Sequence, residues 1–342
     1  MTDTYSQPPT LPVTASDLWV TEKQTPYCGL ALRVRETLVT DRSSFQAIDI
    51  MDTYEYGKML LLDGRVMITD RDEFVYHDMM AHVPVNALRY QGIEPKTVLV
   101  IGGGDGGTVR ELLKAPSIQK VILCEIDGKV VDYSLKYFPA VSGALKDPRV
   151  HVNIGDGIEF LKDKKNEYDI ICVDSTDPIG PAEGLFNSEF YRNVYMALTP
   201  HGIAVAQSES FLFFPDMVKQ IHHKLKKIFP HLGFYQASIP TYPSGTWCFS
   251  FASKTINPLS CRNPDFVEKI KFESTYYNAL IHQGAFALPT FAVKKLNEAE
   301  RREEEKEERR ELGKHIPLNP PLLRGTKGDQ GGCVFPDPFK KL

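Results

Sequence analysis

The 342-residue sequence has no long hydrophobic run and no excess of positive charge. Its longest apolar stretches, such as residues 98–101, are far too short to span a bilayer, so we expect no membrane association. Forty lysines and arginines stand against 44 acidic residues, a net charge of −4. This balance argues against a nucleic-acid partner that is recruited by bulk charge. A net negative charge would suit a cationic small substrate, but so small a surplus of acidic residues does not identify the substrate by itself.

Paired cysteines are also lacking. None of the six cysteines has CxxC spacing, and Cys124 and Cys172 lie inside apolar runs, as is typical of small buried hydrophobes. The polar N-terminal stretch does not have the basic start and apolar centre of a secretory signal. We therefore expect a cytoplasmic protein. Because no His/Cys cluster has metal-ligand spacing, we expect no metal site.

Changes of pattern along the chain suggest four parts. Residues 1–16 are expected to be a flexible N-terminus. Residues 17–72 contain short alternating strands and a hairpin at Asp63, which predict a small antiparallel β domain. Residues 73–296 form a larger domain that begins with a helix. Residues 297–342 carry thirteen charges within fourteen consecutive positions and then become rich in Pro and Gly, so they are predicted to be a disordered tail.

The larger domain alternates strands and helices. After a helix at 74–90, which Pro84 must kink or interrupt, five apolar strands are separated by helical patterns, as in a doubly wound parallel sheet. Two later strands, 233–239 and 246–253, predict a hairpin that adds an antiparallel edge. The five expected strands are 97–101, 120–124, 150–154, 169–174 and 203–207, and the expected helices are 108–115, 128–137, 157–163, 188–198 and 215–228.

A glycine-rich loop follows the first of these strands. Gly102, Gly104 and Gly107 satisfy the pattern G-x-G-x-x-G, and Glu125 lies about twenty residues further on, at the end of the next strand. Glycines allow the backbone to approach a ligand closely, and a carboxylate at that strand end can accept both ribose hydroxyls. The loop predicts nucleoside binding, although the pattern alone does not say which nucleoside.

Asp105, inside the loop, narrows the choice of ligand. A carboxylate in a confined site would repel a pyrophosphate, and it would equally repel the carboxylate of S-adenosylmethionine. It would attract a ligand whose tail ends in a bare ammonium, as in decarboxylated S-adenosylmethionine. Asp156, just past the third strand, and Asp174, at the end of the fourth, belong to the same edge of the predicted sheet as Asp105 and Glu125. We therefore expect four acidic side chains around one crevice.

Taken together, these motifs identify a family. From about Leu18 to about Phe291 the chain resembles the spermidine synthases, the polyamine aminopropyltransferases, and no counterpart is recognised for the tail. The resemblance implies a methyltransferase-like α/β fold after the small β domain. The matching blocks are 44–46, 62–64, 71–77, 102–107, 125–127, 155–157, 174–181, Gln207 and 240–245.

The resemblance implies that an aminopropyl group passes from decarboxylated S-adenosylmethionine to putrescine, giving spermidine and 5'-methylthioadenosine. Asp174 would be the general base. The donor is a co-substrate, no cofactor is implied, and the assembly would be a homodimer or homotetramer. Implied donor ligands are Gln46, Asp105, Glu125, Asp156, Gly157 and Pro181; implied polyamine ligands are Tyr76, His77, Asp105, Asp174, Asp177, Gln207 and Tyr242.

Three other functions stay open at this point. The chain could be a putrescine N-methyltransferase that uses S-adenosylmethionine, against which Asp105 argues by its charge. It could be an NAD-dependent oxidoreductase, which only the glycine pattern suggests, or a polyamine-binding protein without catalysis, which an intact Asp174 makes improbable.

Several residues also have structural alternatives. Asp177 could cap the loop before Pro178, and Tyr76 and Tyr242 could be core residues whose hydroxyls reach a backbone partner. His77 could belong to the pocket or to the scaffold. Trp247 is expected in the core rather than in contact with substrate.

Overall fold

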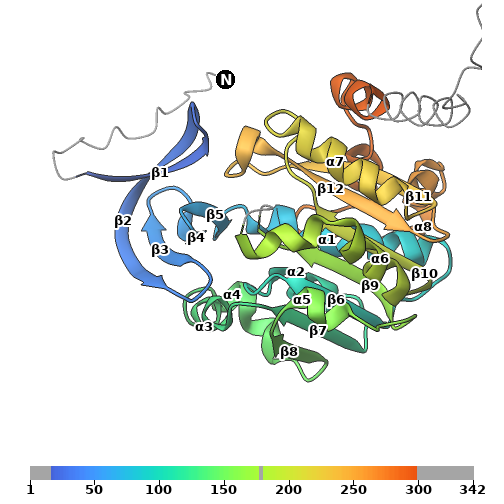
Figure 1. Ribbon diagram of the computed structural model, residues 1–342, viewed down its shortest axis with the longest axis horizontal. Helices are drawn as coiled ribbons and strands as arrows, with labels where there is room; N and C mark the ends of the chain where they lie inside the picture. The colour runs from blue at the N-terminus through green and yellow to red at the C-terminus, as the bar shows by residue number, and fades with distance from the viewer. Residues whose placement is uncertain (1–16, 177–179, 299–342) are drawn as a thin grey trace, which may run out of the picture. The chain divides into compact units, whose positions relative to one another are not determined.

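The computed structural model describes residues 17–176 and 180–298, so the expectations for 1–16, for Asp177 and for 299–342 lie outside the described residues. Five antiparallel strands form the N-terminal sheet, in the order β1-β2-β3-β4-β5 (Figure 1). The turn between the last two contains Asp63, whose φ is +48°, and Gly64, as the hairpin signal predicted. The strands are β1 (Leu18–Thr25), β2 (Cys28–Arg42), β3 (Ala47–Thr53), β4 (Gly57–Leu62) and β5 (Arg65–Thr69).

The N-terminal sheet packs against residues 130–141 of the larger domain. Ile48 and Ile50 of β3 form a buried cluster with Val130 of α3 (Gly128–Tyr137) and with Phe138 and Val141 beside it. Burial of branched and aromatic side chains of this size stabilises such an interface by roughly 1.5–3 kcal/mol each. The β unit is thereby held against α3 and the residues that follow it in the larger domain.

The larger sheet has seven strands in the order β11-β12-β10-β9-β6-β7-β8. The five strands from β10 to β8 are parallel, while β12 pairs antiparallel with both β10 and β11. This confirms the predicted mostly parallel sheet with an antiparallel edge hairpin. The strands are β6 (Thr97–Gly102), β7 (Lys120–Glu125), β8 (Val150–Ile154), β9 (Tyr168–Asp174), β10 (Leu198–Gln207), β11 (His231–Ser238) and β12 (Thr246–Ser253).

Helices cover both faces of this sheet (Figure 1). Val98 and Val100 of β6 pack in one buried cluster with α1 (Glu73–Tyr90), whereas Leu99 and Ile101 belong to a second cluster on the opposite face, with α6 and α7. Alternate residues of one strand thus pack into two hydrophobic cores, one on each face of the sheet, as expected for a buried parallel strand. The other helices are α2 (Gly107–Leu112), α4 (Pro139–Ser142), α5 (Gly157–Leu161), α6 (Ser188–Ala197), α7 (Pro215–Lys226), α8 (Phe266–Lys269) and α9 (Ala279–Ala285), with 3₁₀ segments η1 (Gly143–Lys146), η2 (Gly180–Phe186), η3 (Pro243–Gly245) and η4 (Pro258–Arg262).

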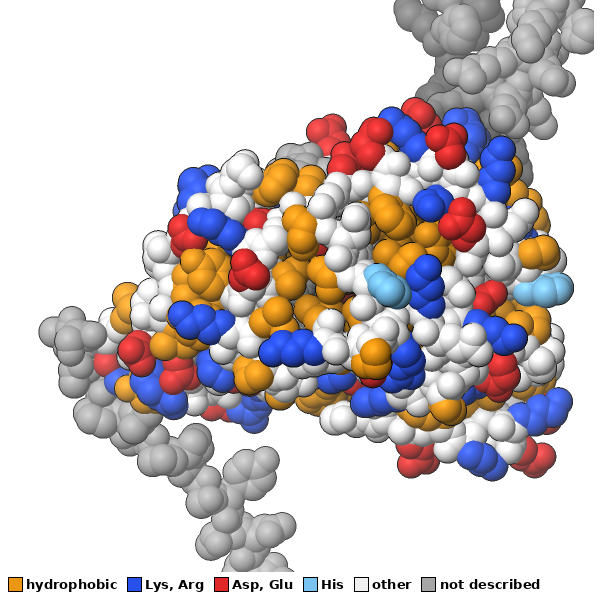
Figure 2. All heavy atoms as spheres, turned by 90° about the horizontal axis from the view of Figure 1, so that it is seen from below, with side chains coloured by type: hydrophobic (Ala, Val, Ile, Leu, Met, Phe, Trp, Pro, Cys, Tyr) orange, Lys and Arg blue, Asp and Glu red, His pale blue; other side chains and the backbone are white. Residues whose placement is uncertain are grey.

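Helix α1 runs without interruption through Pro84, so of the two outcomes predicted for this proline, a kink or an end to the first half of the helix, the second does not occur. One predicted boundary is wrong. Strand β10 begins at Leu198 rather than at residue 203, because a register shift separates an early pair with Tyr168 from the later ladder. Within the described residues, no helix combines the length and apolar character needed to cross a membrane. On the face shown in Figure 2, basic and acidic side chains are intermixed.

Candidate active site

The strand order reverses between β6 and β9, and a cavity of about 290 Å³ lies at the carboxyl ends of these strands. In doubly wound sheets this switch point is where ligands bind. The cavity has walls from both domains, because residues of β4 and β5 line it as well as residues of the larger sheet. All four carboxylates expected at one crevice line it: Asp105, Glu125, Asp156 and Asp174.

Asp174, the last residue of β9, is held by two hydroxyl groups. Tyr76 of α1 donates to its Oδ1 at 2.8 Å, and Thr108 of α2 donates to its Oδ2 at 2.6 Å. Burial raises the pKa of Asp174 to about 6, and repulsion from Asp105 acts in the same direction. A carboxylate of raised pKa, fixed in orientation and facing a cavity, is equipped to accept a proton near neutral pH.

The glycine loop approaches the backbone of Asp174 very closely. Gly103 N–H donates to the carbonyl of Asp174 at 2.8 Å. Gly102 has φ of +78°, and a Cβ at this position would lie 2.1 Å from the same carbonyl oxygen. Only glycine fits there, both for its left-handed backbone and for the space available. The loop therefore fixes the end of β9 as well as offering its own residues to a ligand.

Glu125, at the end of β7, is also oriented by backbone groups. Its carboxylate accepts hydrogen bonds from Gly104 N–H at 3.1 Å and from Asp127 N–H at 2.9 Å. Burial raises its pKa to about 7. Gln46, from the N-terminal sheet, donates to Asp127 at 3.0 Å and lines the cavity next to this group. The β domain is thus joined through Asp127 to the carboxylate of Glu125 and, through Glu125, to the glycine-rich loop.

Asp105 and His77 meet under the glycine loop. The Oδ1 atom of Asp105 accepts a hydrogen bond from Gly107 N–H at 2.7 Å and lies 3.1 Å from His77 Nε2. Although burial acts against it, the positive charge of His77 lowers the pKa of Asp105, which stays ionised. His77, for which the sequence left the pocket and the scaffold open, both lines the cavity and supports Asp105.

Asp156 and Gly157 stand at a more exposed part of the cavity wall. Asp156 is the N-cap of α5, and its Oδ1 accepts Ile158 N–H at 2.7 Å. Gly157 is buried, and a Cβ there would lie 2.5 Å from the side chain of Ile101. This pair can offer a carboxylate oxygen and a close backbone at the rim.

Aromatic side chains line another part of the cavity. The Tyr76 and Tyr242 rings lie 5.8 Å apart, and Tyr242 and Trp247 lie 5.0 Å apart at nearly a right angle. The Tyr242 hydroxyl donates to the carbonyl of Met67 in β5 at 2.7 Å, so it does reach a backbone partner while its ring lines the cavity. Trp247 is buried, as expected, but it lines the cavity too.

Two predicted polyamine ligands remain to be placed. Gln207, at the end of β10, lines the cavity and donates to the carbonyl of Thr176 at 3.2 Å. Asp177 lies outside the described residues, and the side chain of Pro181 is not described either.

Sequence reasoning missed one buried carboxylate in the cavity wall. Glu22 of β1 is 5 % exposed, and its Oε1 accepts Val66 N–H of β5 at 3.1 Å. A single acid in an alternating strand carries no motif, and only the curl that brings β1 to β5 places it inside. It adds a carboxyl group to the lining of the cavity.

Two family models match the chain. The spermine/spermidine synthase domain matches residues 73–262, and the spermidine synthase tetramerisation domain matches residues 18–70. The polyamine aminopropyltransferase of Alkaliphilus metalliredigens is 48% identical over 284 residues, which are 82% of this chain and 98% of the relative. That of Bacillus subtilis is 46% identical over 276 residues, 81% of this chain and 98% of the relative.

Solved structures agree with these relatives. A spermidine synthase in complex with the transition state analogue AdoDATO has a TM-score of 0.77 and 41% identity, covering 82% of this chain and 95% of that one. Spermidine synthase from Thermotoga maritima has a TM-score of 0.75 and 40% identity, covering 82% and 94%. The predicted fold class is confirmed, and the chain belongs to the spermidine synthase family of polyamine aminopropyltransferases.

Proposed function

We propose that this aminopropyltransferase moves the aminopropyl group of decarboxylated S-adenosylmethionine to putrescine, giving spermidine and 5'-methylthioadenosine. The observation that carries the proposal is the ionised Asp105 in the glycine loop, in the same cavity as Asp174. A donor that kept its carboxylate would meet this charge, whereas an ammonium tail is attracted to it. The similar spermidine synthase that binds the transition state analogue AdoDATO also supports this proposal.

The reaction would proceed by in-line displacement at the carbon next to the sulfonium. The amine lone pair forms the new C–N bond, the C–S bond breaks, and its electron pair neutralises sulfur. An alkylammonium has a pKa of roughly 10.4, so a proton must leave the acceptor before attack. Confinement in the cavity and the neighbouring sulfonium charge lower this pKa. Asp174, oriented by Tyr76 and Thr108, accepts the proton.

The donor would lie along the glycine loop. Glu125 accepts the ribose hydroxyls, Asp105 binds the tail ammonium, and Asp156 with Gly157 contacts the base. Gln46 and Pro181 would be the remaining ligands of the nucleoside donor. The role of Pro181 rests on the resemblance alone. Positive charge moves from sulfur to nitrogen during the reaction, and fixed carboxylates along this line stabilise it without reorganising.

The acceptor would occupy the aromatic part of the cavity. Tyr76, Tyr242 and Gln207 surround its chain, with His77 and Asp177 added by resemblance. Glu22 offers a buried carboxyl group to the distal ammonium of a diamine. The similarity of residues 18–70 to a tetramerisation domain supports a homodimer or homotetramer that assembles through the β unit.

Product analysis tests the proposal. Decarboxylated donor with putrescine should give spermidine and 5'-methylthioadenosine by mass spectrometry. Methylputrescine formed from intact S-adenosylmethionine would instead show a methyltransferase. One methylene changes the discrimination between substrates by only about 1–3 kcal/mol, so the preferred acceptor has to be measured. Comparing kcat/KM for putrescine, cadaverine, agmatine and spermidine identifies it.

A further inference from the structure

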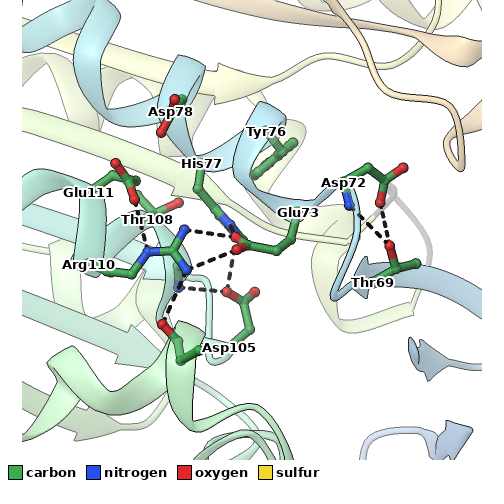
Figure 3. Close-up of polar contacts among 12 residues, drawn as sticks. Thr69, Asp72, Glu73, Tyr76, His77, Asp78, Asp105, Thr108, Arg110 and Glu111 are labelled. Atoms are coloured by element: carbon green, nitrogen blue, oxygen red, sulfur yellow. Dashed lines mark hydrogen bonds and ion pairs between the residues drawn. The ribbon is translucent and has the colours of Figure 1, made fainter. Parts of the chain in front are cut away.

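Behind Asp105 lies a row of charged side chains, two of which, Glu73 and Arg110, the proposed mechanism does not use. Glu73 and His77 come from successive turns of α1, and Arg110 comes from α2 (Figure 3). His77 Nδ1 lies 2.5 Å from Glu73 Oε2, and Arg110 places its two terminal nitrogens 2.9 Å from the two oxygens of Glu73. The row therefore alternates in sign from Arg110 through Glu73 and His77 to Asp105.

The geometry at His77 defines its protonation. Each ring nitrogen faces a carboxylate oxygen, Glu73 on one side and Asp105 on the other. An ionised carboxylate only accepts hydrogen bonds, so both nitrogens must carry hydrogen and the ring must be an imidazolium. The flanking charges support this, because they raise the pKa of His77 well above its usual value although burial opposes them.

The ring is also fixed in place by shape. A Cβ on Gly107 would lie 2.2 Å from Cε1 and Nδ1 of His77, so the imidazolium occupies the space that a side chain would need. The titratable and charged groups around it are Glu73 and Tyr76 from its own helix, Asp105 from the loop, Arg110 from α2 and Asp174 from β9. Gly107, the last glycine of the motif, therefore leaves room for the His77 ring.

Asp105 is held by only one of its oxygens. Oδ1 takes both contacts, from Gly107 N–H and from His77. Within residues 17–176 and 180–298, Oδ2 makes no hydrogen bond, and Asp105 lines the cavity. One oxygen is thus bound to the scaffold and the other remains available to a ligand.

We propose that Glu73 and Arg110 are positioning residues, which hold His77 as a cation so that Asp105 presents Oδ2 to the ammonium of the donor tail. This inference rests on the proposed donor. Glu73 and Arg110 touch no substrate themselves; they act through His77. Each cation of the row lies beside a carboxylate, and Arg110 also pairs with Glu111 through its Nε at 2.9 Å, so Asp105 is oriented without a surplus of positive charge that would repel the tail.

The charge balance predicts a distinctive behaviour for Glu73→Gln. With the carboxylate gone, His77 keeps one anionic neighbour and its pKa falls toward the neutral range. While His77 is still protonated, the cluster is one unit more positive than in the unmodified protein, although Arg110 keeps its pair with Glu111, and it therefore attracts the ammonium tail less. Once His77 loses its proton, the cluster regains the net charge that it has in the unmodified protein. Donor binding to this variant should therefore strengthen as pH rises, through an ionisation that the unmodified protein lacks.

The experiment measures dissociation constants calorimetrically at pH 6 and pH 8.5 on the full chain. For Glu73→Gln we expect decarboxylated S-adenosylmethionine to bind about tenfold more weakly at pH 6 than at pH 8.5, relative to the same ratio in the unmodified protein. 5'-Methylthioadenosine, which lacks the ammonium tail, is the control ligand, and at each pH value its affinity for the variant should stay within about twofold of its affinity for the unmodified protein. Equal weakening for both ligands would mean damage to the fold and would overturn the proposal.

The double variant Glu73→Gln/His77→Gln assigns the ionisation. It has no titrating ring, so the additional pH dependence should disappear. If it persists, His77 is not its source and the proposal is wrong. ¹⁵N NMR of the unmodified protein should show both His77 ring nitrogens protonated at pH 7.5; a ring that titrates near pH 6.5 would contradict the imidazolium. Failure of the proposed function is distinguishable, because the unmodified protein itself would then not favour the decarboxylated donor over the intact one.

Discussion

The two sides of the cavity are built differently. On the donor side, carboxylates at the ends of β6 and β7 are oriented by backbone N–H groups two residues away or in the loop that follows the neighbouring strand, as at Asp105 and Glu125. On the acceptor side, aromatic rings are joined by contacts between distant parts of the chain, such as Tyr242 with Met67 of the β domain. Charge and local turns define the first side; packing between two sheets defines the second.

The difference explains what each side can select. Fixed carboxylates discriminate by charge, and a single misplaced charge in a confined site costs several kcal/mol. Apolar walls discriminate by length and shape, and these differences are smaller. We therefore expect strict selection of the donor and more permissive selection of the acceptor.

The largest expected effect lies where the two sides meet. Asp174→Asn removes the proposed proton acceptor while Tyr76 can still bond to the amide. Turnover should fall by about 10²–10⁴, the range for a lost general base, with donor affinity little changed. Steady-state kcat together with a donor dissociation constant checks this. A variant near the original rate would move the base to Tyr76 or Asp177.

A smaller loss is expected on the donor side from Gly107→Ala. The new Cβ would collide with the His77 ring, so the helix or the ring must shift at a cost of roughly 1–3 kcal/mol. We expect a lower free energy of unfolding and a raised KM for the donor. Gly143→Ala is the matched control, because nothing lies within 4 Å of a Cβ there and its backbone is α-helical. Equal effects of both substitutions would show that the ring contact is unimportant.

The acceptor side should respond most weakly. Tyr242→Phe removes the hydrogen bond to Met67 but keeps the ring, a loss of about 0.5–1.5 kcal/mol. The KM for putrescine should rise by about three- to tenfold while the donor dissociation constant stays the same. Weakened donor binding in this variant would contradict the proposed division of the cavity into a donor side and an acceptor side.

Local signals in the sequence predicted much of the donor side. The bounds of α3 match the expected 128–137, because Asp127 caps the helix through Lys129 N–H. The strand-end positions of the four carboxylates follow from sheet topology, so their convergence on one cavity was predictable. The glycine pattern was interpreted as space for a ligand, whereas at Gly107 the space is filled by His77, which lies thirty residues earlier.

The acceptor side was harder to predict, for a physical reason. Glu22 enters the cavity only because β1 curls back to β5, and Tyr242 is fixed by a carbonyl 175 residues away. Neither contact leaves a periodic or compositional trace. Likewise, the early start of β10 depends on pairing with Tyr168, which is a tertiary contact rather than a local preference.

The central claim is that Asp105 selects the donor by charge, and one comparison of dissociation constants tests it most directly. Decarboxylated and intact S-adenosylmethionine are measured against the unmodified protein and against Asp105→Asn. We predict that the unmodified protein binds the decarboxylated donor at least about tenfold more tightly, and that the ratio falls toward one in the variant. Equal affinity for both donors in the unmodified protein, or a ratio unchanged by Asp105→Asn, would contradict the claim.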